Sequence, residues 1–365
     1  MSLLLRNYGE TDFITGLRFI AAAMVIAIHT QAFRDFGALG NVITDNGKYG
    51  VHIFFVISGF TIARTYRSSG GYGRFVGRRM MRIAPLYYLL ILIAFLLMQN
   101  GTLPRGGWMD YYGVEPDSYN LLMHLTFLSG FDARIANSLL GVEWSIPVEV
   151  FWYLVLPLVL PVTMQAKRRL AIFLGLLVLA GLTRVADHLW LPDHAAHFMP
   201  FSYGALFYLG ALAETWRNQA RDLAPRQRVT LTGAAIVLFV IALVTDTGLN
   251  AALFAVATAG LIVWRESSVT YRGMLSRRPF IFLGSISYSL YLSHPLVLHL
   301  VVMSPMLQAD TRIAGFGVAL LLTTAFSVVT YLLVEYPSNA LGRKLFGLSP
   351  SPDPHESDQP HRHPA

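Results

Sequence analysis

The hydrophobic residues of this chain are gathered into long blocks, which short polar segments separate. Ten of these blocks approach the length of about 20 residues that an α-helix needs to cross a bilayer. We therefore predict ten membrane-spanning helices. Their ranges are Thr15–Phe33, Gly50–Tyr66, Ile83–Met98, Trp144–Met164, Leu170–Trp190, Phe198–Ala213, Val229–Thr245, Leu249–Trp264, Phe280–Met303 and Ile313–Val334. An eleventh apolar stretch, Tyr119–Phe131, is too short to span and is expected to be interfacial or re-entrant.

The composition agrees with a membrane protein. Of the 365 residues, 54% are hydrophobic and 13% are charged, whereas soluble domains have about 25% charged residues. This excludes a disordered chain, a coiled coil and an ordinary cytosolic enzyme. The predicted fold is all-α, a polytopic helical bundle over residues 1–347. Residues 348–365 are rich in Pro, Ser and His and are predicted to be a disordered cytoplasmic tail.

The positive charges predict how the bundle is oriented. The segments that connect successive blocks lie alternately on the two sides of the membrane. Those on one side carry 20 Lys and Arg residues, and those on the other carry 5. Cytoplasmic loops hold the excess of cations, so the first set and both termini are predicted to be cytoplasmic. The formal net charge of +7 is therefore attributed to membrane orientation, and no nucleic-acid partner is expected.

Other features of the sequence limit the chemistry. The chain has no cysteine, which excludes disulfides, thiolate metal sites and an acyl-cysteine intermediate. No metal site and no permanently bound cofactor are expected. The first apolar block contains Arg18 and His29, so we interpret it as a retained membrane helix and not as a cleaved signal peptide.

Two ionisable residues in the first block are candidate functional residues, because charge inside a membrane is costly. Arg18 and His29 are eleven positions apart, which places them on one helix face, roughly 16 Å apart along the axis. Two simpler interpretations stay open. Arg18 could extend to lipid phosphate, and His29 could be a hydrogen-bonded packing residue.

A carboxylate in the fourth block has nearly the same predicted depth as His29. Glu149 lies five residues below the outer boundary of its block and His29 lies four below its own, or roughly 6–8 Å each. We therefore predict a catalytic pair in which Glu149 orients His29 as a base. Glu143 is the competing carboxylate, and we expect it at the interface, where a charge costs little.

The segment before the third block holds six arginines within nineteen residues, among them Arg79 and Arg82 at positions i and i+3. Anchoring of the cytoplasmic side explains such cations in general. The planar guanidinium also suits phosphate, so a phosphate-bearing cytosolic ligand is the functional interpretation. In the ninth block, His294 could satisfy a carbonyl freed by Pro295. Glu335 could pair with a loop arginine.

Together these residues resemble the acyltransferase-3 family of integral membrane acyltransferases. The matching segments run in order from Thr11 to Arg343: TGLRFIAAAMVIAIH, GVHIFFVISGF, RMMR followed by IAPLYY, WSIPVEVFWY, GSISYSLYLSHP and VEYP. Two positions depart from the family pattern. His52 replaces an acidic residue that relatives often carry, and Tyr336 replaces an arginine.

The resemblance implies that an acyl group, commonly acetyl, passes from cytosolic acyl-CoA to a hydroxyl of an extracytoplasmic glycan or glycosylated product. It implies that His29 is catalytic and that Arg18, Arg79 and Arg82 bind the donor. The expected partners are acyl-CoA, a carbohydrate acceptor and the bilayer of a bacterial inner membrane. The alternatives are a proton-coupled transporter or flippase of a glycan precursor, and a scaffold for a glycan synthase.

Overall fold

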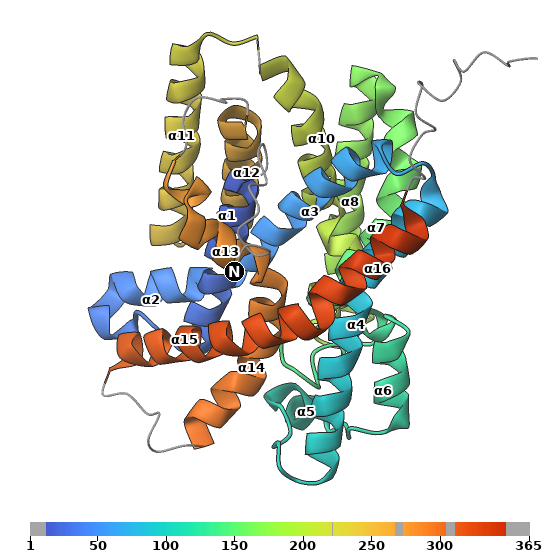
Figure 1. Ribbon diagram of the computed structural model, residues 1–365, viewed down its shortest axis with the longest axis vertical. Helices are drawn as coiled ribbons and strands as arrows, with labels where there is room; N and C mark the ends of the chain where they lie inside the picture. Colours follow the sequence, from blue (N-terminus) through green and yellow to red (C-terminus); the bar gives the residue numbers. More distant parts are fainter. Residues whose placement is uncertain (1–11, 221, 267–272, 304–310, 348–365) are drawn as a thin grey trace, which may run out of the picture.

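The computed structural model describes residues 12–220, 222–266, 273–303 and 311–347 (Figure 1). Within these ranges the chain forms helices and connecting turns, and it contains no β-strand. The predicted all-α class is confirmed. The predicted cytoplasmic tail lies outside the described residues.

The longer helices correspond to the predicted blocks. They are α1 (Asp12–His29), α3 (Gly50–Arg67), α4 (Tyr72–Gln99), α7 (Ser145–Val159), α8 (Ala166–Leu189), α10 (Gly204–Ala220), α11 (Pro225–Val244), α12 (Asn250–Glu266), α14 (Ser287–Met303) and α15 (Arg312–Thr330). The shorter helices are α2 (Gly37–Asp45), α5 (Gly107–Tyr112), α6 (Ser118–Leu125), α9 (Ala195–Phe198), α13 (Arg278–Ser285) and α16 (Tyr336–Phe346).

The structure does not confirm the number of ten spans. Among the described residues, six helices are long and apolar enough to cross a membrane, or seven if α13 and α14 form one span. In α12 the apolar part is the shorter stretch Asn250–Trp264. The helices α3 and α10 carry charged residues in their last turns, which lower their hydropathy. A multi-pass membrane bundle is nevertheless established.

Several helix boundaries differ from the predicted ones. Helix α1 ends at His29 and not at Phe33, and α4 begins at Tyr72, so Pro85 lies inside it. The ninth block is bent by 66° between α13 and α14. The last block continues through a π-helical turn into α16. The stretch Tyr119–Phe131 holds only the short α6 and a 3₁₀ turn, as expected for a segment that does not span.

Helix α3 lies at the centre of the bundle, in contact with α1, α7, α10 and α12 (Figure 1). Its contact with α10 depends on glycine on both helices. A Cβ atom at Gly59 would lie 1.8 Å from the Phe207 carbonyl oxygen, and one at Gly210 would lie 1.9 Å from that of Val56. Helices in membranes approach closely where small residues meet, because dispersion forces drive their association.

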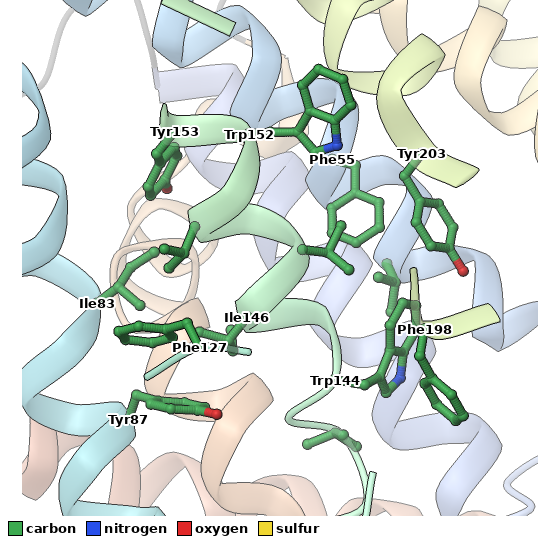
Figure 2. Packing of buried hydrophobic residues seen from close by; sticks show 14 of the residues in the cluster. Phe55, Ile83, Tyr87, Phe127, Trp144, Ile146, Trp152, Tyr153, Phe198 and Tyr203 are labelled. Carbon is green, nitrogen blue, oxygen red and sulfur yellow. The ribbon is translucent and has the colours of Figure 1, made fainter. Parts of the chain in front are cut away.

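Helix α7 carries the aromatic core (Figure 2). On one side Trp144 packs edge-on to Phe55 at 6.2 Å between ring centroids. On the other side Ile146 and Tyr153 face α4, near the stacked rings of Tyr87 and Phe127. The outer helices α8 and α11 differ from α7 in burial. Only 6% of the most apolar stretch of α8 and 11% of that of α11 are buried inside the bundle. Their exposed leucine and valine side chains form the face expected to contact lipid.

Candidate active site

His29 is the last residue of α1 and is exposed at the helix end. Its Nδ1 atom lies 2.8 Å from the carbonyl oxygen of Val25. It also lies 3.3 Å from Nε2 of His294, a fully buried residue of α14. The two imidazole rings are tilted, with centroids 4.9 Å apart. The structure therefore pairs the accessible histidine with a buried one.

The partners of these rings assign their tautomers. Nδ1 of His294 lies 2.6 Å from the carbonyl oxygen of Tyr291. A carbonyl only accepts hydrogen bonds, so this Nδ1 carries the proton and Nε2 of neutral His294 is an acceptor. Nδ1 of His29 then faces two acceptors and must be its protonated nitrogen. Nε2 of His29 is left with a free lone pair, and no described residue bonds to it.

The bond between His294 and Tyr291 has a local cause. Pro295 has no N–H, so the carbonyl of Tyr291, four residues earlier, loses its helical partner. The His294 side chain supplies the missing donor. This role was predicted from the sequence, and the structure confirms it. The contact with His29 was not predicted, because it joins residues 265 positions apart.

Glu149 does not contact His29. Its Oε1 accepts hydrogen bonds from Ser58 of α3 at 2.6 Å and from Tyr153 at 2.5 Å. The predicted orienting pair is therefore wrong. The depth comparison failed because α1 ends at His29, which places the histidine at the helix terminus, whereas Glu149 lies one turn inside α7.

Glu149 instead belongs to a group of arginines. Arg18 interacts electrostatically with Arg82, Tyr153, Glu149 and Arg79. Arg79 likewise interacts with Tyr153, Arg82 and Glu149. The structure thus brings within electrostatic range of one another the three arginines that the family resemblance assigns to the donor. Arg18 lines an internal cavity and so does not extend to lipid phosphate. Its Nε atom is buried and has no hydrogen-bond partner among the described residues.

The arginines differ in how far their guanidinium groups are already engaged by other protein groups. Arg79 is buried, and its Nη2 donates to the Thr61 carbonyl at 3.1 Å and to Thr65 Oγ1 at 2.5 Å. Its guanidinium also lies 5.3 Å from the ring centroids of Phe75 and Tyr153. Arg82 is only partly buried. Both lie within helix α4, not in a loop before it as the sequence suggested.

A small cavity of ≈ 40 Å³ lies beside the arginine group. Arg18 and Glu149 line it together with Ser145, Tyr288 and Tyr291. The Tyr291 hydroxyl donates to the Val142 carbonyl at 2.7 Å, and Tyr291 is also the carbonyl partner of His294. This volume admits water but not a thioester chain. Movement of the lining side chains is required before a substrate arm can pass.

Two other carboxylates are placed differently from expectation. Glu143 is fully buried, where it accepts from the backbone N–H groups of Leu139 and Val142. It is therefore not at the interface. Glu335 is buried in the π-helical turn, where Ser289 donates to it and Arg82 lies within electrostatic range. It thus pairs inside the bundle and not with a loop arginine.

The predicted outer segment between α4 and α7 carries an ion pair. Arg134 donates to both carboxylate oxygens of Asp132, with Nε–Oδ1 and Nη2–Oδ2 distances of 2.8 and 2.7 Å. These bonds hold the pKa of the Asp132 carboxyl below its usual value. The stabilisation of this segment by the pair is complete at pH values above the ordinary pKa of an aspartate, and it is lost as the pH falls through the lowered pKa of Asp132. It lies apart from the histidine pair.

Comparison with known protein families gives the same assignment. The family profile described as an acyltransferase domain matches residues 11–332. The chain belongs to the acyltransferase-3 family. Members of this kind transfer acyl groups, so an enzyme is the class that the matched domain supports.

Individual relatives agree. Over 325 residues the chain is 27% identical to nodulation protein 10 of Rhizobium leguminosarum bv. viciae, covering 78% of this chain and 82% of that protein. It is 25% identical to the O-acetyltransferase OatA of Staphylococcus aureus over 92% of this chain and 58% of OatA. A 156-residue segment is 33% identical to the acyltransferase MdmB of Streptomyces mycarofaciens, covering 40% of this chain and 38% of MdmB. No solved structure matches the chain.

Proposed function

We propose that this acyltransferase moves an acyl group, most simply acetyl, from cytosolic acyl-CoA to a hydroxyl of an extracytoplasmic glycan or glycosylated product. The observation that carries the proposal is the free Nε2 lone pair of His29. His29 is exposed at the end of α1, and its ring is held by Val25 and His294. The names of the relatives, which include an O-acetyltransferase, favour a hydroxyl acceptor.

In the proposed reaction, Nε2 of His29 removes the proton from the acceptor hydroxyl. The oxygen attacks the thioester carbonyl, the C–S bond breaks, and the thiolate leaves and takes the proton back from His29. The imidazolium formed on the way keeps its Nδ1–H bonds to Val25 and His294. A route in which Nε2 first carries the acyl group uses the same lone pair.

The arginine group serves the donor in this proposal. Arg18 lies on the same face of α1 as His29 and roughly 16 Å away along the axis. A donor with the phosphate of its pantetheine arm near Arg82, and with the arm passing Arg18, would bring the thioester toward His29. Glu149 balances the charge of these arginines and positions Tyr153, which is a role apart from the reacting atoms.

The test is acyl transfer by the purified full chain in liposomes, followed as release of the free thiol of CoA from acetyl-CoA in the presence of a cell-surface glycan extract. His29→Ala is expected to lower the rate by about 10²–10⁴-fold. His188→Ala, which changes an exposed histidine at the end of α8, is the matched control. An unchanged rate in His29→Ala would refute the proposal.

A further inference from the structure

A second cavity lies where the ends of several helices meet. Its volume is ≈ 390 Å³, and it is enclosed by the last turn of α3, the segment before α4, the 3₁₀ turn after α7, and helices α8 and α10. The residues that carry the argument are Tyr66, Arg67, Gly70, Gly71, Arg169 and Tyr208. The cation distribution predicts that all these helix ends face the cytoplasm.

The lining favours an anion. Two of the lining residues are arginines, Arg67 and Arg169, and none is acidic. The Arg67 side chain is exposed, and no residue of the described ranges forms an ion pair or hydrogen bond with it. Arg169 interacts electrostatically with Tyr208 across the cavity lining. Arginine forks of this kind are suited to phosphate oxygens.

The start of α4 adds donors to the same cavity. Gly70 and Gly71 line it in backbone conformations with φ of 72° and 131°, which L side chains rarely adopt. The 28-residue helix that follows has no side-chain N-cap and no acidic residue in its first turn. Its first backbone N–H groups and the positive end of its dipole are therefore open to an anion.

An unpaired polar group gives an independent indication. The hydroxyl of Tyr208 is buried and has no hydrogen-bond partner in the described part of the chain. A buried hydroxyl without a partner is unfavourable, so a ligand that supplies one would stabilise the site. Tyr66 links the cavity to the arginine group. Its ring lies 5.5 Å from Phe75, which in turn contacts Arg79.

We propose that this cavity binds the phosphate-bearing nucleotide end of the acyl donor. The inference rests on the proposed function, since it takes acyl-CoA as that donor. The volume lies within the range of about 300–1,000 Å³ found for small-molecule pockets. The adenosine 3′,5′-bisphosphate group meets Arg67, Arg169 and the start of α4, and the arm continues past Tyr66 toward Arg82 and Arg18. An anionic lipid headgroup has the same phosphate chemistry and is the competing source.

The experiment measures binding of CoA and of 4′-phosphopantetheine to the purified full chain in nanodiscs of neutral lipid. Arg67→Gln and Arg169→Gln are each expected to weaken CoA binding about 10-fold. The affinity for 4′-phosphopantetheine, which lacks the nucleotide, should change by less than about twofold. Arg168→Gln removes the neighbouring exposed arginine, which does not line the cavity, and should leave both affinities unchanged.

The outcomes separate this inference from the proposed function. Normal CoA affinity in Arg67→Gln overturns the inference alone. Native mass spectrometry measures the anionic phospholipid that stays bound to the purified chain. If Arg67→Gln loses this lipid while its CoA affinity stays normal, the cavity is a lipid site. Failure of the wild-type chain to bind CoA would overturn the proposed donor itself. Because Arg67 is exposed, its variant tests the site even if Arg169→Gln does not fold.

Discussion

At the scale of single residues, His294 is the decisive neighbour of His29. Its Nδ1 satisfies the Tyr291 carbonyl and its Nε2 accepts from His29. We expect His294→Gln, whose amide oxygen can replace Nε2 as an acceptor, to retain more activity than His294→Asn, whose amide can replace only the Nδ1 donor. The measurement is kcat for acyl transfer. If Asn is the better replacement, the residue serves the Tyr291 carbonyl and not His29.

Glu149 and His29 should act independently, since they do not touch. Glu149→Gln removes the negative charge beside Arg18 and Arg82 but keeps an oxygen for Ser58 and Tyr153. The loss should appear mainly in KM for acyl-CoA, and the free-energy losses of the double variant with His29→Ala should add, as for distant sites. Rates measured for both single variants and the double variant test this. If the double variant transfers acyl groups as fast as His29→Ala alone, the two residues act as one unit. That result would support the predicted pairing of Glu149 with His29.

The two arginines of the RMMR motif should respond differently. The donors of Arg79 are engaged by Thr61 and Thr65, so Arg79→Gln is expected to lower stability. Arg82→Gln should instead raise KM for acyl-CoA by about 10- to 150-fold, the effect of losing a charge-assisted contact of about 1.5–3 kcal/mol. Thermal unfolding and donor kinetics of both variants separate these effects. If the KM for acyl-CoA is the same in Arg82→Gln and in the wild type, Arg82 only anchors the cytoplasmic side of the bundle and does not bind the donor.

At the scale of helices, the close contact of α3 with α10 holds Ser58 and the start of the aromatic core in place. Gly59→Ala puts a methyl group where the Phe207 carbonyl oxygen already lies. Overpacking of this kind costs about 1–3 kcal/mol or more, so the midpoint of thermal unfolding in detergent should fall by several degrees. Gly233→Ala, at a position of α11 with nothing within 4 Å of the added carbon, is the control and should be neutral.

At the scale of the whole molecule, the excess of cations on one set of connections predicts an even number of spans with both ends in the cytoplasm. A reporter fused after Gly347, beyond the end of α16, should be cytoplasmic. A reporter inserted at Gly101, in the exposed turn after α4, should be extracytoplasmic. The same compartment for both would mean an even number of spans between them, instead of the predicted odd number, and would refute the assignment of the donor side.

Much of the architecture follows from the sequence alone, because the membrane forces long apolar segments into helices. The ten blocks, the short segment around α6 and the Pro295-linked role of His294 depend on local spacing, and each was predicted. The shared donor role of Arg18, Arg79 and Arg82 was implied only by the family resemblance, and it stays a prediction.

Only the tertiary structure decided which of these groups meet. The partner of His29 is His294 and not Glu149, and Glu149 belongs with the arginines, because the crossing of α1, α7 and α14 depends on side-chain packing and not on depth. Glu143 is buried because a turn of the backbone supplies its donors. The sequence determines which residues enter the membrane through their local pattern, whereas contacts between distant segments arise from helix packing, which no local pattern records.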